Sequence, residues 1–140
     1  MRQKTEREPT NRFVRTRDDH AKEIAADYVE LIQDLIGRLG EARAADIAAQ
    51  LGVSHVTVTK TIQRLQRDGL VTSLPYRSVF LTEAGRELAA SMKIKHQLVL
   101  DFLLALGVPP DEAETDAEGI EHHVSDATLD AMARFLKARP

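Results

Sequence analysis

Apolar residues recur at helical spacing in the first part of the chain. Between about Asp19 and Leu39 they lie three or four residues apart, so they would line one face of an α-helix. Gly40 follows the last of them and predicts the end of the helix. Residues 1–17 lack this period and contain six Lys or Arg residues. We therefore expect a disordered tail there, or a basic arm that follows DNA phosphates.

The segment 44–65 has the spacing of a helix-turn-helix. Ala48 is small where two helices would cross, Gly52 permits the turn, and Val58 would pack the second helix on the first. Ser54 precedes the second helix and can cap it. An ordinary helical hairpin is the alternative, and the specific turn spacing argues against it. The predicted inner face is Val58, Ile62 and Leu65, and the predicted outer positions are Val56, Thr57, Lys60, Gln63, Arg64 and Arg67.

Two short β-prone runs, 70–74 and 79–81, come next. They flank Pro75-Tyr76-Arg77-Ser78, which predicts a hairpin in the position of the wing of a winged helix. Tyr76 and Arg77 at its tip are candidates for contact with phosphate or the minor groove of DNA.

The remaining chain predicts three more helices. Thr82 can cap a long helix that extends to about Leu106, the prolines 109–110 begin the next helix, and Ser125 caps the last one. Residues 98–106 are too apolar for a helix with a free face, so we expect another subunit to cover them. On the last helix the positions predicted to face inward are Leu129, Met132, Phe135 and Leu136.

Composition narrows the class of protein. The 140 residues are 43% hydrophobic and only 4% aromatic, which predicts one or two small units with cores of Leu, Ile, Val and Ala. The absence of cysteine excludes a disulfide framework, a thiolate zinc site and a cysteine nucleophile, and it agrees with a cytoplasmic protein. No apolar run approaches the roughly 18 residues of a membrane span, and we expect no signal peptide and no membrane partner.

Charge is distributed unevenly along the chain. Residues 1–88 carry 14 Lys or Arg and 13 Asp or Glu, whereas residues 89–140 carry 5 and 9. The segment 55–77 has four basic residues against one acidic residue. A local basic patch on an acidic protein is compatible with nucleic-acid binding through one region.

The acidic stretch 116–123 is the strongest candidate for chemistry. If it is helical, Glu118, Glu121 and His122 fall on one side, and two carboxylates with an imidazole suit a divalent cation. Gly119 within a helix would indicate close backbone approach. A solvated acidic face with an incidental histidine explains the same residues equally well.

Other candidates are ambiguous when each is taken alone. Asp27 and Glu30 form a carboxylate pair at helical spacing, but such a pair is usually part of a polar face. His96 lies at the edge of an apolar run, where a histidine is more often a core residue than a ligand.

In combination, these motifs resemble the manganese transport regulator (MntR) family, within the diphtheria-toxin-repressor (DtxR) superfamily of metal-dependent repressors. The resemblance covers roughly 110 residues, from about Asp27 to the end. The chain departs from the family pattern in its charged N-terminal tail and in its end soon after Phe135, where longer members add another helix or an SH3-like domain. The segments that carry the resemblance are Asp27-Tyr28-Val29-Glu30, Phe80-Leu81-Thr82-Glu83-Ala84-Gly85, Lys95-His96, and Asp116 through Ser125.

The resemblance implies a mostly α fold and a homodimer. A charged tail at 1–18, expected to be disordered, would precede a winged helix-turn-helix DNA-binding domain at 19–82. A helical dimerisation and metal-binding domain would occupy 83–140. The metal ligands that it implies are Asp27, Glu30, His96, Glu118, Glu121 and His122, holding two ions close together.

The implied function is that of a cytoplasmic, metal-dependent repressor of manganese uptake genes, not an enzyme. An all-oxygen-and-nitrogen ligand set suits Mn²⁺ as co-repressor, and Fe²⁺ can use the same ligands. An iron-responsive repressor with the same fold is therefore the alternative. The partner would be a double-stranded DNA operator. The expected DNA contacts are Ser54, Val56, Thr57, Lys60, Arg64, Arg67, Tyr76 and Arg77.

Other classes of protein explain less of the sequence. A di-metal oxidase or hydrolase would use Glu-x-x-His pairs from a four-helix bundle, whereas this chain has Glu-x-x-Glu-His once and a predicted winged helix. A winged-helix regulator that senses an organic ligand, in the manner of the MarR proteins, would need an apolar pocket at a dimer interface and no metal dependence. A purely structural interaction domain leaves the carboxylates unexplained.

Overall fold

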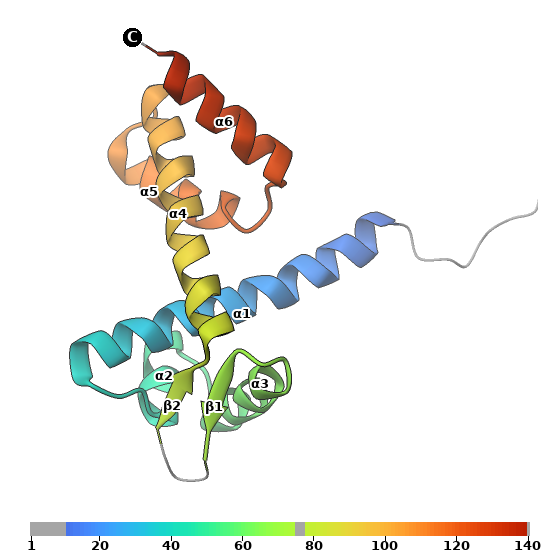
Figure 1. Cartoon of the computed structure of the whole chain (residues 1–140), viewed down its shortest axis with the longest axis vertical. Helices are drawn as coiled ribbons and strands as arrows, with labels where there is room; N and C mark the ends of the chain where they lie inside the picture. The colour runs from blue at the N-terminus through green and yellow to red at the C-terminus, as the bar shows by residue number, and fades with distance from the viewer. Residues whose placement is uncertain (1–10, 75–77, 140) are drawn as a thin grey trace, which may run out of the picture.

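The computed structural model describes residues 11–74 and 78–139, which form a winged helix and a small helical unit joined by one long helix. Figure 1 shows α4 leading from the winged helix, past α1, to α5 and α6. The fold is mostly helical, as the sequence predicted. The elements are α1 (Asn11–Leu39), α2 (Ala44–Leu51), α3 (His55–Arg67), β1 (Val71–Ser73), β2 (Val79–Leu81), α4 (Glu83–Ala105), α5 (Pro110–Ile120) and α6 (Asp126–Ala138).

The winged helix has an aliphatic core. Ile32, Ile47 and Val58 are completely buried, and they bring α1, α2 and α3 together. The wing is an antiparallel pair in which Val71 lies opposite Leu81. The backbone N–H of Val79 donates to the carbonyl oxygen of Ala42 at 2.8 Å, so the wing is hydrogen-bonded to the α1–α2 loop as well as packed on the core.

The predicted helix starts are confirmed by side-chain caps. Ser54 Oγ accepts a hydrogen bond from the backbone N–H of Thr57 at 3.1 Å, and Thr82 Oγ1 accepts one from Gly85 at 3.1 Å. Ser125 Oγ does the same for Thr128 at 3.2 Å. Each bond satisfies a donor that the first turn of a helix leaves unpaired.

Gly52 and Gly85 are among the glycines whose conformation or surroundings disfavour a side chain. Gly52 has φ of 69°, in the left-handed region that a tight turn between α2 and α3 requires. A Cβ on Gly85 would lie 2.1 Å from the carbonyl oxygen of Leu70. Glycine at this position therefore lets the start of α4 lie directly against the end of the α3–β1 turn.

The C-terminal helices have a second, smaller core. Val99 of α4, Ala117 of α5 and Leu129 of α6 are buried together, so much of the apolar half of α4 is covered within the chain. Phe102 and Phe135 meet edge to face, with ring centroids 5.4 Å apart. The prediction that Phe135 faces inward is wrong, because its contact lies at the margin of this core and 43% of the residue stays exposed.

Three other expectations need correction. Helix α1 begins at Asn11, earlier than predicted, because neither proline nor glycine interrupts the chain from there to Ile36; the remainder of the expected tail lies outside the described residues. Helix α5 ends at Ile120, so His122 follows the helix in a tightened turn. No atom lies within 4 Å of a Cβ built on Gly119, so the close approach expected there is absent.

Among the helices the structure describes, none is both long and apolar enough to cross a membrane.

Candidate metal centre and DNA-binding face

Acidic and histidine side chains from α1, α4 and the end of α5 meet where α1 crosses α4. Asp27 and Glu30 lie one turn apart on α1, beside the buried residues Tyr28 and Val29. Burial of those two neighbours in the winged-helix core fixes the orientation of the helix and leaves the two carboxylates on the side that faces α4 and α5. Asp27 Oδ1 lies 3.6 Å from Nε2 of His122.

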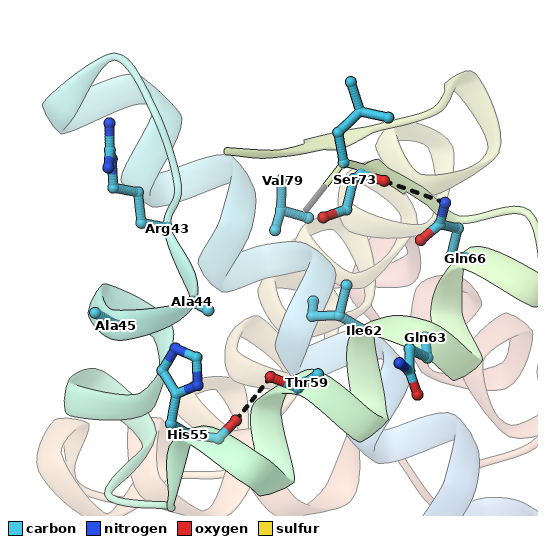
Figure 2. Close-up of a pocket in the computed structure, with 11 residues that line it drawn as sticks. Arg43, Ala44, Ala45, His55, Thr59, Ile62, Gln63, Gln66, Ser73 and Val79 are labelled. Carbon is cyan, nitrogen blue, oxygen red and sulfur yellow. Dashed lines mark hydrogen bonds between the residues drawn. The ribbon is translucent and has the colours of Figure 1, made fainter. Parts of the chain in front are cut away.

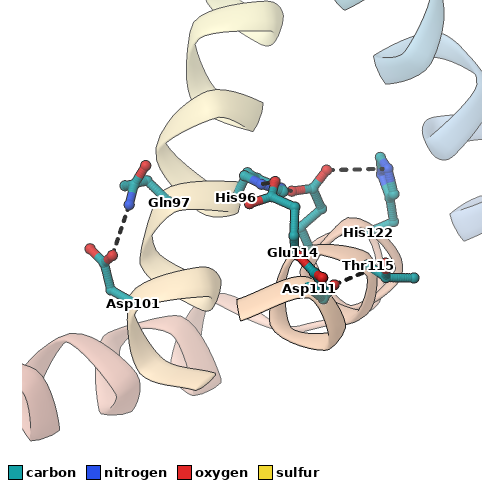
Figure 3. A network of polar contacts seen from close by, with 8 residues as sticks. His96, Gln97, Asp101, Asp111, Glu114, Thr115 and His122 are labelled. Carbon is teal, nitrogen blue, oxygen red and sulfur yellow. Dashed lines mark hydrogen bonds and ion pairs between the residues drawn. The ribbon is translucent and has the colours of Figure 1, made fainter. Parts of the chain in front are cut away.

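His96 of α4 lies between the carboxylates of Glu114 on α5 and Glu121 just after it; Figure 3 shows the ring beside Glu114. Its Nδ1 is 2.8 Å from Oε2 of Glu121, and its Nε2 is 2.5 Å from Oε1 of Glu114. His122 Nε2 is also 3.6 Å from Oε1 of Glu121. Glu121 therefore contacts both histidines, and it is the centre of the cluster.

Glu121 is the only charged residue that is buried in the part of the chain that the structure describes, with 4% of its surface exposed. A buried carboxylate is costly unless it is protonated, paired or bound to a cation. Burial raises the pKa of Glu121, although His96 and His122 act in the opposite direction.

The carboxylates of α1 are also disfavoured in their charged form. Burial first, and then repulsion by Glu121, Asp27 and Glu118, raises the pKa of Glu30 from 4.5 to about 7. Burial likewise raises the pKa of Asp27, against an opposing effect of His122. Several negative charges at short range shift carboxyl titration in this direction when no cation is beside them.

His96 experiences two opposing effects. Burial alone would lower the pKa of its imidazole, but the hydrogen bonds and charges of Glu114 and Glu121 outweigh burial and raise it. The ring therefore holds its protons more tightly than a free histidine does. A cation that took one ring nitrogen would have to displace a proton from it.

The six side chains predicted as ligands lie in one cluster. Some are in direct contact, and others interact with the cluster through charge or lie close to it. Asp27, His122, Glu121 and His96 are linked by contacts within 3.6 Å. Glu30 is coupled to them by charge. Glu118 is exposed, and one of its carboxylate oxygens lies within 4.8 Å of ligand atoms of His96 and Glu114.

Glu114 was missed by the reasoning from sequence. It lies one turn before Glu118 on α5, so it shares a face with Glu118. That spacing was a usable signal. The contact with His96 was not predictable, because it depends on how α5 packs against α4.

The donor set fits a divalent cation. Carboxylate oxygens dominate, with imidazole nitrogen from His96 and His122 and no sulfur. This is the composition that hard ions such as Mn²⁺ favour. A buried carboxylate among carboxyl groups with raised pKa values is also typical of a functional site.

The outward face of α3 is exposed, as predicted. Val56 is 63% exposed, and Lys60 and Arg67 are also exposed, whereas Arg64 is partly buried. The hydroxyl of Ser54 is occupied by the cap and by a 3.0 Å contact with Thr57 Oγ1. Tyr76 and Arg77 lie outside the described residues.

A hollow of about 700 Å³ is lined by residues of α3, the wing and the start of α2. Figure 2 shows His55, Thr59, Gln63 and Gln66 along one side of it, following α3. Gln66 Nε2 donates to the carbonyl oxygen of Ser73 at 3.3 Å and ties α3 to the wing. Polar side chains of α3 thus face this hollow, beside the apolar side chains of Ile62, Leu74 and Val79.

Comparisons with known proteins agree with both parts of this arrangement. Residues 21–79 match the family model described as the iron-dependent repressor N-terminal DNA-binding domain. Residues 82–139 match the iron-dependent repressor metal-binding and dimerisation domain. The two models together cover most of the chain.

Individual relatives and solved structures match over most of the chain as well. It is 52% identical over 132 residues to the transcriptional regulator MntR of Escherichia coli O157:H7, covering 94% of this chain and 85% of that protein. It is 38% identical to MntR of Bacillus subtilis, over 79% of this chain and 78% of that one. A manganese-dependent transcriptional repressor solved with manganese aligns with a TM-score of 0.70 at 32% identity, covering 82% of this chain and 53% of the other. The chain thus spans about half the length of that solved structure.

Proposed function

The chain belongs to the iron-dependent repressor family and is a metal-dependent transcriptional regulator of the MntR type, not an enzyme; from that premise we propose that Mn²⁺ is its co-repressor. Its sites would then switch DNA binding according to the manganese supply of the cell. The regulated genes would be those for manganese uptake, and the protein would act in the cytoplasm on double-stranded operator DNA. The observation that carries the proposal is the convergence of carboxylates from the DNA-binding half with histidines and carboxylates of the other half.

We propose that the ligands are the six clustered side chains and that they hold two ions per subunit. A bound divalent cation supplies the positive charge that lets these carboxylates lie together in their ionised form. Support comes from the burial of Glu121 and from the raised pKa of Glu30. The ligands would be Asp27, Glu30, His96, Glu118, Glu121 and His122.

The choice of Mn²⁺ over softer ions follows from the donor atoms. Asp27 and Glu118 supply carboxylate oxygen, and the chain contains no cysteine. Oxygen donors favour a hard ion, and thioether or thiolate donors favour softer ones. Fe²⁺ can be bound by the same set, so the test below includes it.

Coupling between the two halves follows from the position of α1. Asp27 and Glu30 are on the helix whose buried face, including Val29 and Ile32, belongs to the winged-helix core. Their partners belong to α4 and the end of α5. When these carboxylates are held against His96 and His122, the winged helix is fixed relative to the C-terminal helices. When they repel one another, that orientation loses stability, and DNA binding would fall by a shift in population.

In a homodimer, the orientation of each winged helix relative to the C-terminal helices would set the distance between the two recognition helices. Leu104 and Leu106 at the end of α4 are 41% and 57% exposed, and a second copy could cover them. Two recognition helices bind two half-sites only when their spacing matches the DNA repeat, about 34–36 Å per turn or a multiple. The proposed domain boundaries are 19–82 for DNA binding and 83–140 for dimerisation and metal binding.

On DNA, α3 would enter the major groove. Val56 can pack against a thymine methyl group, and Thr57 and Lys60 can reach base edges. Arg64 and Arg67 can contact phosphate, and Tyr76 and Arg77 of the wing remain proposed contacts as well. Ser54 contributes through its cap, which places the first turn of α3.

Binding of the full-length protein to its own promoter region tests the proposal. Affinity would be measured with Mn²⁺, Fe²⁺, Zn²⁺ or a chelator, at one fixed salt concentration. We expect tight binding with Mn²⁺ and weak, non-specific binding in chelator. Equal affinity in chelator and in saturating Mn²⁺ would refute metal dependence, and stronger activation by Fe²⁺ than by Mn²⁺ would identify an iron-responsive repressor.

A further inference from the structure

We propose that Glu114 is a positioning residue for the metal centre: its carboxylate holds the Nε2–H of His96, so that Nδ1 of the same ring is the nitrogen offered to the cation. The inference rests on the proposed function, because it assigns a role within the same site. Glu114 is not among the ligands that the family resemblance implied.

The geometry gives the two nitrogens of His96 different surroundings. Nδ1 lies 2.8 Å from Glu121, a proposed ligand with 4% of its side chain exposed, so this nitrogen faces the interior of the cluster. Nε2 lies 2.5 Å from Glu114, whose side chain is 56% exposed, so this nitrogen faces outward. Figure 3 shows the ring between α4 and the start of the α5 segment with Glu114 beside it.

A ring nitrogen can bind a metal only through its lone pair, so the neutral imidazole must carry its proton on the other nitrogen. A carboxylate that accepts a hydrogen bond from that other N–H selects the tautomer, orients the ring and makes the ligating nitrogen more basic. Glu114 is placed to do all three. Without it, the Nε2–H tautomer loses its acceptor, and Glu121 alone holds the ring, through Nδ1.

Packing of α5 keeps Glu114 in place. Its neighbour Ala113 and the following Ala117 are completely buried, so small side chains bring this face of α5 close to α4. Pro110 at the first turn also restricts the start of the helix. The backbone of Glu114 is therefore held even though its carboxylate is exposed.

A direct role as ligand is the competing explanation, because one oxygen of Glu114 also lies within 4.8 Å of ligand atoms of His96 and Glu118. The contact with Nε2 favours the positioning role. A single histidine would have to be doubly deprotonated to give one nitrogen to an ion at the interior and the other to an ion at Glu114.

The test measures Mn²⁺ affinity and the state of the ring separately. Affinity would come from the electron paramagnetic resonance signal of free Mn²⁺ titrated into the full-length metal-free protein. The variants are Glu114→Ala and Glu114→Gln, with Glu112→Gln as control, because residue 112 is two positions earlier and lies on the opposite side of α5. We expect Glu114→Ala to weaken binding by roughly 10-fold or more, as loss of such outer partners does. Glu114→Gln keeps an acceptor without the charge and should fall between, and Glu112→Gln should match the wild type.

The second readout identifies the ring nitrogen that carries the proton. Proton–nitrogen correlation spectra of the protein bound to diamagnetic Cd²⁺ should show His96 as the Nε2–H tautomer in the wild type. In Glu114→Ala, we expect a mixture of tautomers or the Nδ1–H form. Circular dichroism of each variant would confirm that the fold is retained.

A third measurement compares Glu114→Ala in the wild-type and His96→Ala backgrounds. If Glu114 acts through the histidine, its substitution has no further effect when His96 is absent. A further loss of affinity in that background would make Glu114 a ligand and overturn the positioning role. Unchanged affinity and tautomer in Glu114→Ala would overturn it too, whereas a wild-type protein that binds no Mn²⁺ would overturn the proposed function itself.

Discussion

The winged helix and the acidic cluster beside it are stabilised in opposite ways. The winged helix is closed by aliphatic side chains such as Ile32, Ile47 and Val58, which are completely buried, and Ser54 caps the start of α3. In the acidic cluster, Glu121 is buried as a titratable group, and the pKa of Glu30 is raised to about 7. The winged helix is stabilised by apolar burial, whereas the cluster contains several carboxyl groups whose charged forms are disfavoured.

This difference indicates which region of a regulatory protein can respond to a bound ion. A packed apolar core has one preferred arrangement and responds little to its surroundings. Carboxylates that repel one another are held together only when their charge is compensated. Asp27 and Glu30 belong to a helix of the winged helix but lie in the acidic cluster. A change of charge in the cluster can therefore change how the winged helix is oriented.

The largest effect is expected from the apolar core. Ile47→Ala removes a completely buried side chain of α2 and should lower the free energy of unfolding by about 2–5 kcal/mol. Denaturant unfolding with and without Mn²⁺ would measure it, with Gln50→Ala on the exposed side of α2 as control. We expect the increment that Mn²⁺ adds to stability to be unchanged. Loss of that increment would show that the core of the winged helix and the metal centre are energetically coupled.

The next effect concerns metal choice. Asp27→Met replaces a hard anionic oxygen with a neutral thioether, so Mn²⁺-activated operator binding should weaken by about tenfold or more while Fe²⁺ or Co²⁺ becomes comparatively better. Operator binding against free metal concentration would measure it for each ion. Asp34→Ala is the control, because Asp34 pairs with Arg38 at 2.8 Å on the exposed side of α1 and that pair is worth only a few tenths of a kcal/mol. Wild-type ranking and midpoints in Asp27→Met would mean that Asp27 is not a ligand.

On DNA, Lys60→Ala and Arg64→Ala should differ in kind. If Lys60 contacts base edges, its loss should cost about 1–3 kcal/mol at one base pair and relax specificity there. Arg64→Ala should weaken all sequences about equally and lower the salt slope by roughly one. Binding to a set of operator variants at several salt concentrations separates the two. A uniform loss from Lys60→Ala would show that Lys60 contacts only phosphate.

The smallest effect is expected from pH on the metal-free protein, because solvent partly screens the charges of Asp27, Glu30 and His96. The pKa values of Glu30, Asp27, Glu121 and His96 are all raised in the folded state. A raised pKa means that the folded state binds more protons than the unfolded state, so stability should decrease as pH rises through those values. For Glu30 the window is 4.5 to about 7.

Thermal unfolding between about pH 5 and pH 8 would measure this trend, in chelator and in Mn²⁺. In chelator the melting temperature should fall by a few degrees with rising pH, and Glu30→Gln should flatten the curve. In Mn²⁺ the added stability should grow with pH, because metal binding requires deprotonated ligands. A metal-free melting temperature that rises with pH across this window would contradict the raised pKa values.

Local features of the protein could be predicted from the amino-acid sequence alone. Helix starts were predictable at Ser54, Thr82 and Ser125, because a capping side chain acts on the backbone only a few residues away. The turn at Gly52 and the buried positions of α3 were predictable for the same reason, since both depend on short spacing. The six clustered side chains could be named through the family resemblance, which preserves the order of motifs along the chain.

The differences among the clustered side chains, by contrast, depend on how the helices pack. Glu118 and Glu121 are three residues apart and alike in sequence, yet Glu121 is buried between two histidines and Glu118 is exposed. The contact of Glu114 with His96 and the place of Gly85 against Leu70 also depend on how α4 meets its neighbours. Burial, charge repulsion and close approach are sums over residues that are distant in the chain, so no local pattern contains them.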